Sequence, residues 1–208
     1  FQAKLLFGNA SESDVASSLN KAIELLNDIN NKVSSPFRLI EIANLQITMK
    51  NYSQAESTLL LWEKKFRKRF NPAFKQELYA NLGHIAFQTD DIKQHIYYRE
   101  KSLYWTLQTS NDQQKSVAHS NLAWAYQITG QYDKAETHYI DALRLSRLVK
   151  DDVGVESCLL RLIEVTYLQG KTVQAKEMLI DIPDSFVSQI SAKSNQDLYQ
   201  TLKQQLSN

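Results

Sequence analysis

The chain has 208 residues, enough for one large domain or two small ones with a buried core. Its five glycines and three prolines are too few for the many tight turns of an all-β fold, so we expect helices joined by short connections. The formal net charge of +1 gives no overall attraction to nucleic acid or to an anionic membrane.

The single cysteine, Cys158, excludes an internal disulfide and a multi-cysteine metal site. It leaves the compartment open, with the cytoplasm favoured over a cysteine-poor periplasm. No stretch approaches the roughly 20 apolar residues that span a bilayer, so we expect no membrane insertion. The sequence begins at Phe1 rather than at Met, which indicates a processed chain or a piece of a longer protein.

A sequence pattern repeats along the chain at an offset of 40 residues. One aliphatic column contains Ile42, Leu82, Leu122 and Leu162. A second column, mostly of small residues, contains Ala55, His95, Ala135 and Ala175. Columns in a constant register are typical of stacked helical repeats.

Apolar residues three and four positions apart predict two helices in each repeat. The chain begins with the remnant of a helix at 1–8 and a helix at 13–29. Four helix pairs follow, at 37–49 with 52–68, 76–89 with 92–108, 116–129 with 132–148, and 156–169 with 172–181. A last helix is predicted at 192–206. The predicted divisions are a truncated N-terminal repeat at 1–35, repeats at 36–75, 76–115, 116–155 and 156–185, and a capping helix or the start of a further repeat at 186–208.

Two columns of turn residues keep the same register. The joint between repeats carries Asn31, Asn71, Asn111 and Asp151, whose side-chain oxygens can cap the following helix. The joint inside each repeat falls at Lys50, Asp90, Gly130 and Gly170, where the two glycines can adopt the left-handed conformation that ends a helix.

These residues resemble the tetratricopeptide repeat family. The positions that carry the resemblance are Leu122, Ala123, Tyr126, Gly130, Tyr132, Ala135, Tyr139 and Ala142, with Ile42, Ala43, Tyr52 and Ala55 in an earlier repeat. Departures occur at His95, Ile163 and Thr172. The resemblance covers residues 13–182 and implies an all-α, right-handed superhelical solenoid of stacked antiparallel helix pairs, with no cofactor. The period exceeds the usual length of about 34 residues, and it is similar to the long repeats of bacterial regulatory proteins.

The resemblance also implies a binding surface on the concave face, lined by the first helix of each repeat. Carried over by position, the candidates are Asn44, Asn81, His84, Phe87, Ser120, Asn121, Trp124, Gln127, Arg161, Glu164 and Tyr167, beside Ile40, Ile47, Ala80 and Leu160. Aromatic rings among amides suit an extended peptide. Trp124 and Phe87 fit packing between repeats equally well.

The sequence favours a protein- or peptide-binding scaffold or sensor, as part of a larger bacterial regulatory protein. The alternative is a small-ligand sensor with a closed apolar pocket near Phe87, Trp124 and Tyr167. Self-association through terminal repeats is a further possibility, since an uncapped repeat exposes apolar surface.

Catalysis and metal binding find no support in the sequence. The histidines at 84, 95, 119 and 138 fall on different predicted helices, without the spacing of a metal motif. Cys158 is expected to be a buried structural thiol. The basic run at 64–69 ends a predicted helix, where cations complement the helix dipole, so we expect no nucleic acid as partner.

Overall fold

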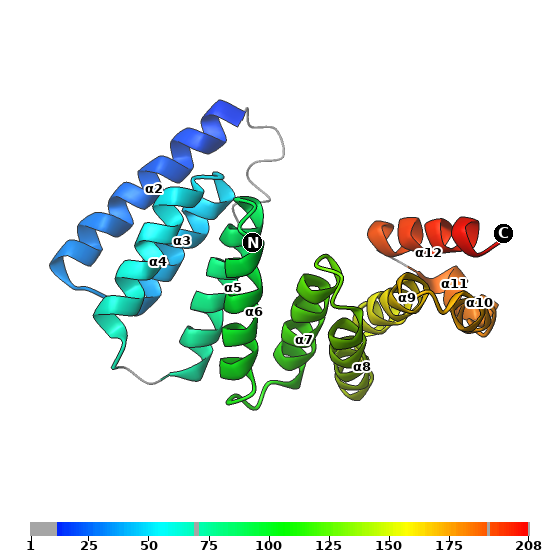
Figure 1. Ribbon diagram of the computed structural model, residues 1–208. Helices are drawn as coiled ribbons and strands as arrows, with labels where there is room; N and C mark the ends of the chain where they lie inside the picture. Colours follow the sequence, from blue (N-terminus) through cyan, green and yellow to red (C-terminus); the bar gives the residue numbers. More distant parts are fainter. Residues whose placement is uncertain (1–11, 69–70, 191, 208) are drawn as a thin grey trace. The chain divides into compact units, whose positions relative to one another are not determined.

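The computed structural model describes residues 12–68, 71–190 and 192–207, and the secondary-structure elements in these ranges are all α-helices (Figure 1). The chain forms two compact units, Phe1–Asp91 and Ile92–Asn208. The expected all-α class of packed helix pairs is confirmed. The helix expected at 1–8 lies outside the described residues.

The first unit contains α2 (Glu12–Lys32), α3 (Pro36–Thr48), α4 (Tyr52–Phe66) and α5 (Pro72–Gln88). α3 pairs with α4, α2 packs against α3, and α5 packs against both α3 and α4. Trp62 on α4 is 1% exposed, and its indole Nε1 donates a hydrogen bond of 3.0 Å to the carbonyl oxygen of Pro36. This bond ties the end of the second helix to the start of the first.

The second unit contains α6 (Ile92–Thr106), α7 (Asp112–Gln127), α8 (Tyr132–Leu148), α9 (Asp152–Leu168), α10 (Thr172–Ile180), α11 (Asp184–Gln189) and α12 (Lys193–Leu206). Each helix from α6 to α9 packs against the next along the chain, α7 also contacts α9, and α12 packs against α9 and α10. α11 was not predicted. It begins after Pro183, and Phe186 and Val187 pack against the apolar cluster that α9, α10 and α12 share.

In the pairs α3 with α4, α7 with α8 and α9 with α10, the second helix carries a fully buried small residue that allows close packing. Ala55, Ala135 and Ala175 are each 0% exposed, as is His95, which occupies the same column in α6. The larger His95 ring meets the edge of the Trp124 ring at a centroid distance of 5.7 Å. The second helices begin at residues 52, 92, 132 and 172, which is consistent with the 40-residue offset. The repeat boundaries themselves stay a prediction.

The joints inside the repeats adopt the left-handed conformation that the sequence predicts. The backbone φ is +59° at Lys50, +61° at Asp90, +73° at Gly130 and +79° at Gly170. After each of these residues, the next backbone N–H returns to a carbonyl five positions back: Asn51 to Gln46, Asp91 to Ala86, Gln131 to Tyr126, and Lys171 to Thr166. These are Schellman turns, which satisfy the last carbonyls of the first helix and start the second.

Three of the four predicted side chains cap a joint between repeats, whereas the prediction for Asn31 was wrong, because Asn31 lies within α2 and α3 begins after Ser35. The Asn71 Oδ1 accepts from the Ala73 N–H, the Asn111 Oδ1 from the Gln114 N–H, and the Asp151 Oδ1 from the Gly154 N–H, each at 3.0 Å. Because the cap lies immediately before the helix, α5, α7 and α9 begin four residues earlier than the predicted starts at 76, 116 and 156. Those three predicted boundaries were wrong.

Introducing glycine at one left-handed position of the second unit and removing it from another should change the free energy of unfolding in opposite directions. Lys150 has φ +57°, so Lys150→Gly relieves strain of about 1–2 kcal/mol, partly offset by the greater freedom of glycine in the unfolded chain. Gly130→Ala introduces the same strain, although nothing lies within 4 Å of the added methyl group. In urea unfolding, we expect Lys150→Gly to raise the free energy of unfolding slightly and Gly130→Ala to lower it by about 1 kcal/mol.

The contrary outcome is equally clear. If Lys150 were in a helical conformation, Lys150→Gly would cost about 1 kcal/mol, as glycine does within a helix.

Candidate functional site

Two of the candidate residues in the first unit contact each other across successive first helices. The Asn81 Nδ2 on α5 donates to the Asn44 Oδ1 on α3 at 2.7 Å, and the Asn44 Nδ2 lies 3.4 Å from the Glu77 Oε1. His84, one turn further along α5, has its ring centroid 6.4 Å from that of Tyr52 in an edge arrangement. Phe87 is half-buried on the same helix. The predicted residues of this unit therefore share one face, on which the amides are joined.

The second unit brings three candidates together in a hydrogen-bonded network. The Glu164 Oε2 on α9 accepts from the Gln127 Nε2 on α7 at 2.8 Å and from the Arg161 Nη1 at 2.7 Å. The Gln127 Oε1 in turn accepts from the hydroxyl of Tyr139, a residue that is 1% exposed on α8. We call Gln127, Arg161 and Glu164 the first-helix ladder, because they join the first helices of two successive repeats.

The network is buried at Gln127 and accessible to solvent at Arg161 and Glu164. Gln127 is 8% exposed, whereas the side chains of Arg161 and Glu164 are 32% and 23% exposed. Burial raises the pKa of Tyr139, so its hydroxyl stays a neutral donor. The outer ends of the ladder therefore keep a charged pair at the surface.

The remaining candidates of the second unit flank the ladder or support it from within. Trp124 packs beside the core of the α7 and α8 pair, and Tyr167 packs against the cluster of α9, α10 and α12. Both rings, like Asn121, are half-buried. Ser120 forms a side-chain hydrogen bond with the Cys158 thiol. Trp124 is therefore partly buried against the core, and its place in a binding groove stays a prediction.

Two aliphatic residues of the same columns belong to the core and not to a surface. Ile40 is 4% exposed and Leu160 is 0% exposed. Their inclusion among the groove positions was wrong, because the helix turns them toward the neighbouring helices.

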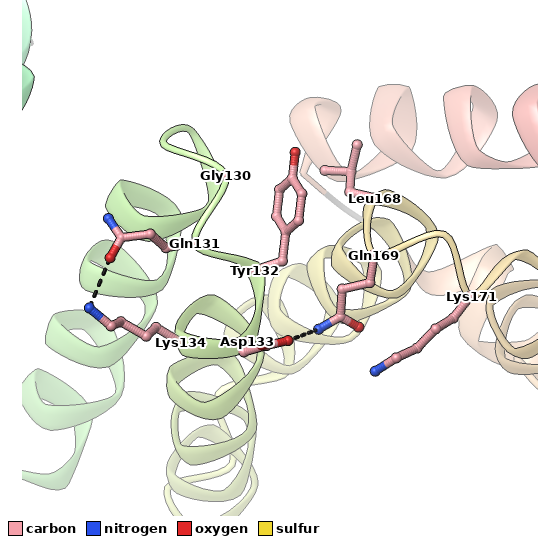
Figure 2. Close-up of a pocket in the computed structure, with 8 residues that line it drawn as sticks. All are labelled: Gly130, Gln131, Tyr132, Asp133, Lys134, Leu168, Gln169 and Lys171. Atoms are coloured by element: carbon pink, nitrogen blue, oxygen red, sulfur yellow. Dashed lines mark hydrogen bonds between the residues drawn. The ribbon is translucent and has the colours of Figure 1, made fainter.

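A hollow of about 530 Å³ lies where two successive joints meet, at residues 130–134 and 168–171 (Figure 2). In its wall, the Gln169 Nε2 donates to the Asp133 Oδ1 at 3.0 Å and to the Glu136 Oε2 at 2.8 Å. The Lys171 Nζ lies 3.8 Å from the same Glu136 oxygen. Small-ligand pockets are mostly apolar, so this polar hollow differs from the closed apolar pocket expected of a ligand sensor.

Sequence reasoning did not find a cluster of side chains that could hold a metal ion. The Nδ1 atoms of His119 on α7 and His138 on α8 are 3.0 Å apart, and Asp141 lies one turn beyond His138. The two histidines lie on different helices, as predicted, and the α7 and α8 hairpin brings them together. The spacing of His138 and Asp141, three residues apart on one helix, was the available signal.

Cys158 is a buried thiol, as expected, and is 2% exposed. Burial raises its pKa to about 11, although the hydrogen bond with Ser120 lowers the value in part. The basic segment ends a helix, as predicted from the sequence. Its residues Lys64, Lys65, Arg67 and Lys68 are exposed at the end of α4. Among the described helices, none is both long enough and apolar enough to cross a bilayer.

The native chain should resist alkylation at Cys158. A pKa near 11, against 9 for an ordinary thiol, gives about a 100-fold smaller thiolate fraction near neutral pH, and burial hinders the reagent further. We expect iodoacetamide at pH 8 to label the native chain at least about 100-fold more slowly than the chain in urea, as measured by mass spectrometry. Equal rates in both conditions would contradict the buried placement.

Comparison with known proteins supports the interpretation of the repeats. A sequence model described as tetratricopeptide repeat matches residues 117–147, which cover most of α7 and α8. A search of curated proteins gave no match.

Three similar solved structures cover most of the chain at 15% identity. BtubC (BKLC) from P. vanneervenii has a TM-score of 0.67, with 90% of this chain and 81% of that chain covered. The apo form of RapI has a TM-score of 0.78, with 93% and 55% covered. The STAND signal transduction ATPase with a tetratricopeptide repeat sensor from Pyrococcus horikoshii has a TM-score of 0.70, with 89% and 28% covered.

This chain spans about half the length of RapI and less than a third of the ATPase. At this identity the likeness establishes the fold. Together with the matched segment and the helix pairs described above, it shows a fold of stacked helix pairs like that of tetratricopeptide repeat proteins, with the sequence pattern of that family matched at residues 117–147.

Proposed function

We propose that the chain is a protein- or peptide-binding scaffold in which an extended segment of the partner lies along the first helices of successive repeats. The observation that carries the proposal is the first-helix ladder of Gln127, Arg161 and Glu164, flanked by the half-buried rings of Trp124 and Tyr167. The ladder crosses from one repeat to the next, so a bound segment would contact both.

The chemistry of this face suits a peptide backbone. An extended peptide presents N–H and C=O groups along its length, and carboxylates, amides and guanidinium groups can pair with both kinds. Glu164 and Arg161 are partly screened from water at 23% and 32% side-chain exposure, which strengthens such hydrogen bonds. The two rings add apolar contact area at a small cost in conformational entropy.

The first unit presents polar side chains of similar chemistry on its own first helices, α3 and α5. Asn44 is exposed, and Asn81, which is bonded to it at 2.7 Å, is half-buried beside His84. Each amide retains further donor or acceptor capacity after one shared hydrogen bond. These residues form a separate, smaller candidate surface on α3 and α5 within the first unit.

The proposed wider role is that of a sensor or scaffold module in a larger regulatory protein. The ATPase from Pyrococcus horikoshii is described as having a tetratricopeptide repeat sensor, and this chain is similar to 28% of it. A bacterial origin stays a prediction from the repeat length, and self-association through terminal repeats also stays a prediction.

Panning a library of extended peptides against the chain tests the binding surface. The test variant is Trp124→Ala with Arg161→Ala, and the matched control is Ile140→Ala with Leu148→Ala, which removes two exposed side chains from α8. Peptides enriched on the parent should bind the control equally. They should bind the test variant roughly 30-fold more weakly, since loss of an interface hot spot costs about 2 kcal/mol or more.

Peptides that bind the parent and the test variant alike would exclude this face as the docking surface. In parallel, native mass spectrometry of the chain purified from its own cells would detect a retained metabolite. If a metabolite is retained and no peptide is enriched, the result would favour the alternative function, a small-ligand sensor, over the scaffold.

A further inference from the structure

A cluster of two imidazoles and a carboxylate lies between the helices of one pair, away from the first-helix ladder. His119 belongs to α7 and is 8% exposed, while His138 and Asp141 lie one turn apart on α8. The His119 Nδ1 is 3.0 Å from the His138 Nδ1 and 3.9 Å from the Asp141 Oδ2. All three possible ligand atoms lie within 4.8 Å of one another.

These separations fit a tetrahedral metal ion. Zinc binds imidazole nitrogen and carboxylate oxygen at about 2.0–2.2 Å, so two ligand atoms of a tetrahedral site lie about 3.3–3.5 Å apart. The distance from the His119 Nδ1 to the His138 Nδ1, 3.0 Å, is below this range, and the distance to the Asp141 Oδ2, 3.9 Å, is above it. Small rotations of the side chains would therefore bring all three atoms to the bonding distance, without movement of the helices.

The surroundings hold the imidazole rings in place. His119 is 8% exposed between the two helices. The Tyr126 ring stacks on the His138 ring at 5.6 Å with an interplanar angle of 14°, which fixes the plane of the imidazole. Tyr126 is itself held by a hydrogen bond to the Glu100 Oε1 at 2.7 Å.

The nearby charges leave one carboxylate oxygen available. The Arg144 Nη2 lies 3.6 Å from the Asp141 Oδ1, whereas the Oδ2 faces His119. Arg144 is 66% exposed, so water screens most of its repulsion toward a cation. Glu100 acts on His138 from α6 and contributes negative charge. Carboxylates that bind a metal ion usually have a polar neighbour at the other oxygen, which helps to orient them.

From this geometry we propose that His119, His138 and Asp141 form a zinc-binding site that joins α7 to α8. The ion is held by two Nδ1 atoms and one carboxylate oxygen, and its fourth position is open to water or to a donor from a bound molecule. The site would hold the helix pair of the repeat at 116–155 together through coordinate bonds, independently of the peptide-binding role.

The competing explanation is a hydrogen bond between the two rings, in which one Nδ1–H donates to the other Nδ1. Such a bond involves no carboxylate and needs no ion. Asp141 therefore distinguishes the two explanations, and Asp141→Asn keeps the size of a side chain that is 39% exposed.

Isothermal titration of the whole chain with zinc chloride, after treatment with a chelator, tests the proposal. We expect one ion per chain, and a loss of at least about 100-fold in affinity for Asp141→Asn and for His138→Gln, because an outer partner alone contributes 10–100-fold. The control is Asp197→Asn, which removes an exposed carboxylate that is paired on α12. It should bind zinc as the parent does, and circular dichroism should confirm that each variant is folded.

Nitrogen NMR of the imidazoles gives a second readout. Zinc should shift the Nδ1 resonances of both His119 and His138 to the range of a metal-bound nitrogen. The proposal is overturned if zinc leaves these resonances unchanged, or if the parent, Asp141→Asn and His138→Gln bind zinc with the same affinity.

Discussion

The close approach of two helix backbones at a fully buried small residue is the constraint on which the other features of each repeat depend. Ala135 is 0% exposed on α8 and lies in the apolar cluster that α8 shares with α7. A second helix can reach this distance only if the chain reverses tightly after the first. The left-handed residue and the Schellman hydrogen bonds provide that reversal, since they end one helix and place the next within a few residues.

The same constraint explains why the candidate binding residues are partly buried. First helices that stack closely bring side chains from adjacent repeats into contact, so Gln127 meets Glu164 and Asn44 meets Asn81. Polar groups in such positions must be hydrogen-bonded before a partner arrives. The surface is therefore organised in advance, which reduces the entropy that binding must overcome.

The sequence was most informative where structure depends on neighbouring residues. The left-handed joints at Gly130 and Gly170 and the caps at Asn71, Asn111 and Asp151 follow from local side-chain chemistry, and the structure confirms them. The helix starts were misplaced because the apolar pattern, which marks the buried middle of a helix, does not reach its polar first turn.

Contacts across helices were beyond the reach of sequence patterns. Gln127 and Glu164 are 37 positions apart, and His119 and His138 are 19 apart, so their meeting depends on the exact rotation of each helix about its axis. A column of aligned residues gives that rotation only approximately. For this reason Ile40 and Leu160 were placed on the wrong side of their helices. The candidates Arg161 and Glu164, which follow Leu160 on α9, do share one network.

The packing of α12 has a consequence for how a cell would treat a damaged copy of this protein. Leu202 is 0% exposed and Leu206 is 5% exposed against Leu160, Ile163 and Ala175, and the segment that links α11 to α12 is short. A 14-residue helix has little stability alone, so α12 depends on this packing for its own structure. Loss of the packing would uncover leucine and isoleucine side chains, which form the kind of apolar surface that chaperones and degradation machinery act upon.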